Sequence, residues 1–176
     1  MTDLSALRET YRSDKAALLT QLGQIQLRSV TVSRTLAKLT RLTDVLLTSL
    51  WQRAGLDASK GCLMAVGGYG RGELLPHSDV DVLVLLPDTT ELDTDAALQA
   101  QLEAFIGSCW DVGLEIGSSV RTLSQCLAES DNDITVQTAL LESRRITGQP
   151  QLAQNFEQAY AQAMDAQAFF TAKTLE

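Results

Sequence analysis

The sequence is poor in the residues that build histidine-dependent and metal-thiolate sites. It has one histidine, His77, and three cysteines, Cys62, Cys109 and Cys126, none of which forms a CxxC pair. These residues do not have the spacing of a zinc site. The odd number and wide separation of the cysteines indicate buried free thiols in a protein of the reducing cytoplasm.

Basic residues are also in short supply. Lys and Arg number 14 against 22 Asp and Glu, which gives a formal net charge of −8 and a pI near 4.6. Such a chain has no basic surface that could gather nucleic acid or anionic lipid without specificity. We therefore expect neither nucleic acid nor a membrane as a partner.

Long apolar runs are missing as well. The longest, residues 82–87, is far too short to span a bilayer, and the first fifteen residues lack the apolar segment of a signal peptide. We therefore expect a cytoplasmic protein. The 176 residues are enough for one domain with a sizeable core.

Hydrophobic periodicity predicts helices at both ends of the chain. Residues 3–55 have a helical pattern, in which Leu39, Leu42, Leu46 and Leu50 line one face, and Gly55 is a suitable stop. The β-branched stretch 29–33 is predicted to separate two helices. The tail from Gln151 is rich in Gln and Ala and has helical propensity.

The middle of the chain predicts a small sheet. Apolar stretches at 62–66 and 79–87 and the alternating stretch 113–122 are typical of strands, and residues 93–110 of a helix. The loop 67–78 is expected to hold one helical turn at 72–75. Thr122 with Gln125, and Ser130 with Asp133, resemble capping boxes. The second of these helices is predicted to run to Gly148, with Arg144 and Arg145 near its C-terminal end.

These patterns predict an α+β fold, with a small mixed sheet of about three to five strands flanked by helices. We divide the chain into an N-terminal helical segment, residues 1–58, a core, residues 59–148, and a helical tail, residues 149–176.

Two aspartates stand one residue apart at the start of the second predicted strand. Asp79 and Asp81 project to the same side of that strand, with Cα atoms roughly 6.5–7 Å apart. Leu83 and Leu85 continue this face into the core. A single such aspartate is more typical of a solvated strand start or turn cap. The pair beside a core repel each other, and a bound Mg²⁺ would relieve that repulsion. The pair therefore favours a metal site.

A glycine-rich turn follows the first predicted strand. Gly67 and Gly68 can expose backbone amides in an anion-binding concavity, and the missing Cβ atoms leave room for phosphate oxygens. The spacing of the glycines does not fit the GxGxxG dinucleotide-binding pattern, and no Gly-Lys-Ser/Thr of a Walker A loop is present.

Together these residues resemble a known family. Gly67-Gly68, followed after ten residues by Asp79-Val80-Asp81, is similar to the signature of the DNA-polymerase-β-like nucleotidyltransferase superfamily. The stretches "GGYGRGELLPHSDVDVLVLL", "WDVGLEIGSSVRT" and "DITVQTALLESRRITG" resemble more narrowly the bacterial PII-protein uridylyltransferase (uridylyl-removing) family. The resemblance covers about residues 61–148. The superfamily often has Gly-Ser where this chain has Gly67-Gly68, so backbone amides would replace the serine hydroxyl.

The resemblance implies a nucleotidyltransferase fold with a helical lead-in, and a reaction. UMP would pass from UTP to a tyrosine hydroxyl of the PII protein by in-line displacement with Mg²⁺, or alternatively Mn²⁺. Asp79 and Asp81 would bind the metal as catalytic residues. Gly67, Gly68, Arg71 and Ser78 would bind the nucleotide.

The family also implies a third carboxylate, which would draw the acceptor's proton. We choose Glu115, which faces away from the core side of Leu114 and Ile116. Its alternatives are Asp111, Asp131, Asp133, or a plain salt-bridge role for Glu115.

Three further side chains have two interpretations each. Arg71 and Arg121 would either neutralise phosphate charge or pair with carboxylates. Tyr69 would either stack on a base or pack the glycine turn down.

Full-length members of the family continue into an HD hydrolase domain and tandem ACT domains. One histidine cannot furnish an HD metal site, so we expect an N-terminal part of the transferase without uridylyl removal or glutamine control. Two other functions remain open. One is a non-catalytic nucleotide-binding or regulatory module of the same fold, and the other is an adenylyltransferase with another acceptor.

Overall fold

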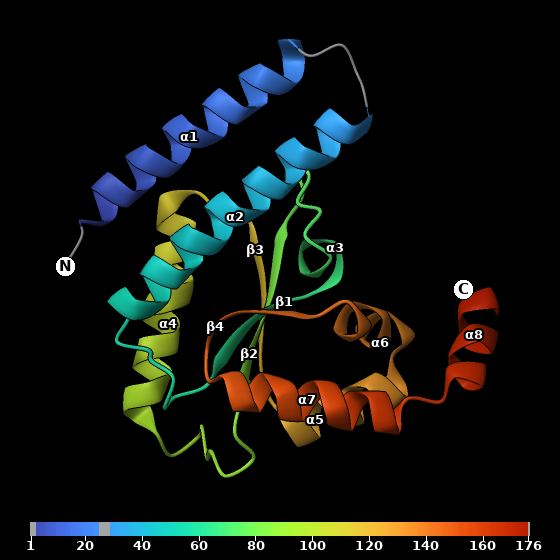
Figure 1. Ribbon diagram of the computed structural model, residues 1–176. Coiled ribbons are helices and arrows are strands. Elements are labelled where there is room, and N and C mark those ends of the chain that lie inside the picture. Colours follow the sequence, from blue (N-terminus) through green and yellow to red (C-terminus); the bar gives the residue numbers. More distant parts are fainter. Residues whose placement is uncertain (1–2, 25–28, 176) are drawn as a thin grey trace.

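The computed structural model describes residues 3–24 and 29–175, which form one four-stranded sheet with helices on both faces (Figure 1). This arrangement confirms the predicted α+β class. In chain order the elements are α1 (Leu4–Gln24), α2 (Ser29–Arg53), β1 (Cys62–Ala65), α3 (Gly67–Gly70), β2 (Val80–Leu86), α4 (Ala96–Val112), β3 (Ile116–Thr122), α5 (Leu123–Asn132), α6 (Ile134–Leu141), β4 (Arg144–Gly148), α7 (Pro150–Ala163) and α8 (Ala166–Leu175).

The strand order is β3-β2-β1-β4. β1 runs antiparallel to both of its neighbours, whereas β2 and β3 are parallel. The residues before β2 and before β3 therefore lie at the same end of the sheet, and the segment that follows β1 lies there too. This end brings the glycine turn next to the two aspartates.

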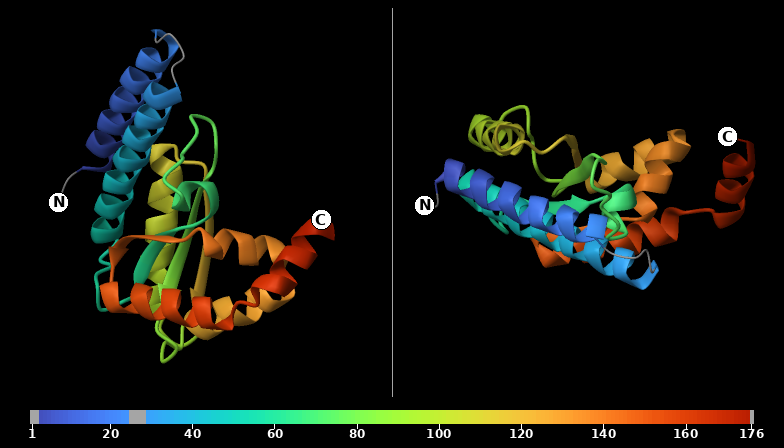
Figure 2. Two further views of the ribbon diagram at one scale, coloured as in Figure 1. Left: turned by 45° about the vertical axis from the view of Figure 1, so that its right-hand side comes forward. Right: turned by 90° about the horizontal axis from the view of Figure 1, so that it is seen from above.

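Helices cover both faces of the sheet (Figure 2), and each face has its own hydrophobic core. On one face, Trp51 of α2 packs edge-to-face on Phe105 of α4, with ring centroids 5.5 Å apart. On the other face, Phe156 of α7 belongs to one core with buried side chains of β1 and β2. Because side chains alternate along β2, Val82 belongs to the first core and Leu83 to the second.

The N-terminal helices confirm the leucine pattern. Leu39, Leu46 and Leu50 are buried and Leu42 packs against them. Gly55 has φ +78°, as expected of a residue just past a helix end. The predicted separation at 29–33 is wrong, because α2 begins at Ser29 and continues through these residues. β-branched residues cost only fractions of a kcal/mol each in a helix, which is too little to break one.

Capping explains where the later helices begin and end. The Asp95 side chain accepts a hydrogen bond from Leu98 N at the start of α4, and Gly113 closes that helix at φ +87°. The Thr122–Gln125 capping box of α5 is confirmed. The Ser130–Asp133 box is wrong. Asp133 itself caps α6, while Ser130 Oγ donates to the carbonyl of Leu127.

Two other predicted helical stretches are wrong. The helix expected to run to Gly148 ends at Leu141, and Arg144 and Arg145 start β4, which pairs with the edge of β1 that β2 leaves open. The turn predicted at 72–75 lies instead at α3, because Pro76 disfavours helical geometry in the residue before it.

No helix formed by the described residues combines the length and the apolar character that crossing a bilayer requires.

Candidate active site

The two aspartates and the glycine turn share one cavity. Val66 N donates to the carbonyl of Asp81 at 3.1 Å, which holds the exit of β1 beside the start of β2. The cavity has a volume of about 490 Å³ and is lined by Leu36, Gly68, Tyr69, Arg71, Glu73, Leu75, Ser78, Asp79 and Asp81. The structure thus brings together six of the residues that the sequence singled out: Gly68, Tyr69, Arg71, Ser78, Asp79 and Asp81.

The charged form of Asp81 is disfavoured by its surroundings in this cavity. Partial burial raises the pKa of its carboxyl, and the neighbouring charge of Asp79 raises it further. A cation between the two carboxylates would remove this penalty. Within the described residues no group of three or more His, Cys, Asp and Glu side chains is arranged to hold a metal ion. Two carboxylates still fit Mg²⁺, which commonly completes its shell with water and substrate phosphate oxygens.

Gly117 is a site residue that the sequence reasoning missed. It pairs with Asp81 across the parallel strands β2 and β3. A Cβ built on Gly117 would overlap the Oδ1 atom of Asp81, so the carboxylate occupies the space that a side chain would fill. A glycine inside a predicted strand was the available signal, since it often marks a close approach.

The glycine turn is fixed by its neighbours on one side and open on the other. Gly67 has φ +57°, which favours glycine. A Cβ on Gly70 would overlap the carbonyl of Glu142, whereas a Cβ on Gly68 would meet only Arg71 Nη2 at 3.6 Å. Gly68 therefore has free space above it in the cavity. Tyr69 is buried and donates to Asp44. Of its two interpretations, this favours packing the glycine turn down over stacking on a base.

Both arginines considered for phosphate binding contact carboxylates. Arg71 donates to Glu73 and Glu142, and these bonds raise the pKa of its guanidinium. Arg71 still lines the aspartate cavity. Arg121 pairs in register with Leu85 near the far end of the sheet and lies 3.9 Å from Glu129. It lines a separate cavity and is not part of this site.

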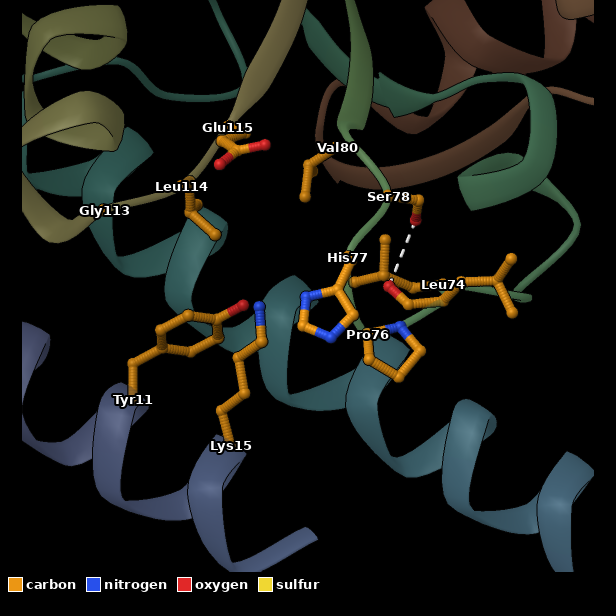
Figure 3. A pocket seen from close by; sticks show the side chains of 11 residues that line it. Tyr11, Lys15, Leu74, Pro76, His77, Ser78, Val80, Gly113, Leu114 and Glu115 are labelled. Carbon is orange, nitrogen blue, oxygen red and sulfur yellow. Dashed lines mark hydrogen bonds between the residues drawn. The ribbon is translucent and has the colours of Figure 1, made fainter. Parts of the chain in front are cut away.

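Glu115 lies one strand away from the aspartate pair. Its carbonyl accepts a hydrogen bond from Val80 N at 2.8 Å. Its side chain, however, lines a second cavity of about 120 Å³, where Tyr11 and Lys15 extend from α1 toward His77 (Figure 3). Ser78 lines both cavities, so they adjoin. The structure places Glu115 next to the aspartates without bringing its carboxylate into their cavity.

The three alternatives to Glu115 line neither cavity. Asp133 caps α6 by accepting from Thr135 N and Val136 N, and these bonds lower its pKa. Asp131 lies in α5, where its charge adds to the effect of burial in raising the pKa of Tyr160 to about 12. Asp111 is exposed near the end of α4.

The chain is similar to known enzymes over most of its length. A bifunctional uridylyltransferase/uridylyl-removing enzyme of Burkholderia orbicola is 52% identical over 94% of this chain, one of Burkholderia vietnamiensis is 53% identical over 96%, and one of Burkholderia mallei is 57% identical over 78%. The chain spans only 16–19% of the length of these relatives.

A solved structure of a toxin-antitoxin with AMP-PNP matches 74% of this chain and 90% of its own, with 14% identity and a TM-score of 0.36, which is too low to bear on function. The nucleotidyltransferase domain family matches residues 50–139, about half of the chain, including both aspartates and the glycine turn. The chain belongs to the nucleotidyltransferase domain family.

Proposed function

We propose that this chain transfers UMP from UTP to a tyrosine hydroxyl of the PII signalling protein in a Mg²⁺-dependent in-line displacement. The observation that carries the proposal is the single cavity shared by Gly68, Asp79 and Asp81. The choice of uridylyl transfer is supported by the names of the Burkholderia relatives. The PII acceptor follows from the family resemblance.

Each residue has a role in this proposal. Asp79 and Asp81 hold Mg²⁺, which when bound neutralises the triphosphate and stabilises the charge that develops during transfer. The turn at Gly67 and Gly68 holds the phosphates through backbone amides, and Ser78 and Arg71 border the same space. Glu115 takes the proton of the acceptor hydroxyl from the adjoining cavity.

The bonds balance as follows. The tyrosine oxygen forms a bond to the α-phosphorus of UTP, the bond from that phosphorus to the bridging oxygen breaks, and pyrophosphate leaves. The hydroxyl proton goes to Glu115. Orientation of the two reactants supplies much of the acceleration, so no histidine or thiol nucleophile is required.

A transfer assay tests the proposal. The chain is incubated with Mg²⁺, α-labelled UTP and PII, and labelled PII is quantified. Asp81→Asn should abolish transfer, and Glu115→Gln should lower it about a hundredfold if Glu115 is the base. Asp93→Asn removes an equal charge from an exposed position on the β2–α4 connection and should leave transfer unchanged.

The same assay separates the other functions. Mg²⁺-dependent binding of UTP with no transfer to PII would mean a non-catalytic module and would refute the proposal. Transfer from ATP in preference to UTP would mean an adenylyltransferase. A wild-type rate equal to that of Asp81→Asn would exclude the aspartate pair from the reaction.

A further inference from the structure

A network of three side chains connects the glycine turn to two distant parts of the chain. The hydroxyl of Tyr69 donates to Asp44 Oδ1 at 2.6 Å. Arg144 donates to both oxygens of the same carboxylate, at 2.9 and 3.0 Å. The guanidinium of Arg144 also lies over the Tyr69 ring, 5.6 Å from its centroid. Asp44 belongs to α2 and Arg144 to β4, so one network joins α2, α3 and β4.

This network is partly shielded from water. Tyr69 is 2% exposed, and the side chains of Arg144 and Asp44 are 33% and 23% exposed. Burial, together with the Asp44 charge, raises the pKa of the Tyr69 hydroxyl far above its ordinary range, so the tyrosine remains a donor. Burial alone would lower the pKa of Arg144, but the bonds to Asp44 outweigh it and raise it. Bidentate and charge-assisted bonds of this kind are the strong ones.

Tyr69 is the only residue with a side chain in the turn Gly67-Gly68-Tyr69-Gly70. The three glycines can contact their surroundings only through backbone. Gly70 does so against the carbonyl of Glu142, which fixes one end of the turn. Backbone bonds from Arg71 N to the carbonyl of Gly67 and from Glu73 N to the carbonyl of Gly68 hold the turn internally. Its position relative to the aspartates depends in addition on what holds Tyr69.

The same helix also holds the loop that follows the turn. The buried hydroxyl of Thr40, one helical turn before Asp44 in α2, donates to the carbonyl of Gly72 at 2.9 Å and accepts from Leu74 N at 3.3 Å. α2 thus contacts both the turn and the loop leading to Asp79. Asp44 and Arg144 both lie outside the range 50–139 that the nucleotidyltransferase domain family matches.

We propose that Asp44 and Arg144 are positioning residues, which act through Tyr69 to hold the Gly67-Gly68 turn where the nucleotide's phosphates meet Asp79 and Asp81. This inference rests on the proposed function, since it takes the turn to be the phosphate site. It makes the N-terminal helices part of the nucleotide site rather than a separate appendage.

The test compares two tyrosine-to-phenylalanine variants. Tyr69→Phe keeps the ring and removes the bond to Asp44. Tyr160→Phe removes a hydrogen bond of the same length, 2.6 Å, from another buried tyrosine, whose partner is the carbonyl of Gln137 in α6 and not a member of this network. For each full chain the thermal midpoint, the dissociation constant for Mg²⁺-UTP and the KM and kcat for UTP are measured.

Both variants should lose stability, Tyr69→Phe the more because its bond is to a charged carboxylate, but only Tyr69→Phe should lose nucleotide affinity. We expect its dissociation constant and KM for UTP to rise about tenfold, with a smaller change in kcat. Asp44→Asn should raise the KM for UTP similarly. The double variant with Tyr69→Phe should have a KM no higher than that of the single variant with the larger increase, because both changes break one network.

The outcomes separate the two proposals. If the wild-type chain does not bind Mg²⁺-UTP, the proposed function is refuted and this inference is refuted with it. If the wild type binds and Tyr69→Phe binds equally well despite a lower thermal midpoint, the network is only structural and this inference alone is refuted. Equal loss of affinity in Tyr69→Phe and Tyr160→Phe would refute it as well.

Discussion

The carboxylate of Asp81 on β2 lies over the bare Cα of Gly117 on β3, in the space that a side chain at that position would occupy. An alanine there would collide with the end of a flexible side chain rather than with backbone. Asp81 could turn aside at little cost to folding, but it would then leave the position that faces Asp79. The missing side chain of Gly117 on β3 thus sets where the carboxylate of Asp81 on β2 can lie.

We expect Gly117→Ala to lower transfer about a hundredfold with little loss of stability, because a displacement of about 1 Å in a reacting group has an effect of that size. Transfer assays and urea unfolding measure the two quantities. Gly107→Ala is the matched control. A Cβ at Gly107 has open space, and alanine in the middle of α4 should stabilise the protein by up to about 1 kcal/mol while transfer stays the same.

Two alanine substitutions in the glycine turn should behave in opposite ways. Gly70→Ala would overlap the backbone of Glu142 and should destabilise the protein by about 1–3 kcal/mol. Gly68→Ala has only an ordinary contact with Arg71, so stability should hold while affinity for UTP falls about tenfold. Urea unfolding and calorimetric titration with Mg²⁺-UTP measure the pair. Undiminished UTP affinity in Gly68→Ala would show that this turn does not bind the phosphates.

Asp81→Asn should make the metal-free protein more stable at pH 7. The substitution removes a partly buried charge and its repulsion with Asp79, the two causes of the raised pKa of Asp81. Because water screens this partly exposed group, we expect a rise of only about 1–3 °C in the thermal midpoint. Adding Mg²⁺ should then raise the midpoint of the wild type but not of the variant. A lower midpoint for Asp81→Asn in the absence of metal would contradict this account.

The three buried cysteines should make the protein sensitive to alkali. Burial raises the pKa of Cys62 and Cys109 to about 12 and that of Cys126 to about 11, from an ordinary value of 9.0. Below pH 9 the thiols are protonated in both states and cost nothing. Above it only the unfolded thiols ionise, so stability falls between pH 9 and about 11–12, by on the order of 1 kcal/mol per thiol for each pH unit.

Urea unfolding at pH 8, 9 and 10 under reducing conditions measures this loss. Cys109→Ala should flatten the pH dependence, since one of the three thiols is gone. Rapid reaction of the native protein with a thiol reagent at pH 8 would show that the cysteines are not protected.

The parts of the fold that were predicted correctly are those encoded locally. The leucine stripe of α2, the capping box at Thr122 and the presence of Asp79 and Asp81 at one cavity each depend on residues a few positions apart. β4 could not be found this way. Its residues form a strand because β1 offers an open edge more than seventy positions earlier in the chain, and no local pattern records that edge.

The candidate site likewise has parts that local patterns predict and parts that depend on distant residues. The glycine turn and the aspartate pair are a short motif, so the sequence identified them together. Gly117 required the register of β2 against β3, and the contact of Asp44 with Arg144 joins residues 100 positions apart. The carboxylate of Glu115 was expected beside the aspartates, and strand pairing puts its backbone there. Its side chain lines the adjoining cavity, to which α1 contributes Tyr11 and Lys15, and no local pattern predicts that this distant helix borders the same end of the sheet.

β4 also covers an edge of the sheet that could otherwise pair with other chains. All four residues of β1 are buried, and β4 covers the edge of β1 that faces away from β2. A chain cut at residue 139, where the family match ends, would keep the glycine turn and both aspartates but leave β1 as an outer strand. Its unpaired amides and carbonyls, flanked by apolar side chains, would be a template for other chains to add to the sheet. The candidate site is therefore complete in a shorter stretch of the polypeptide than the one that also covers this edge of the sheet.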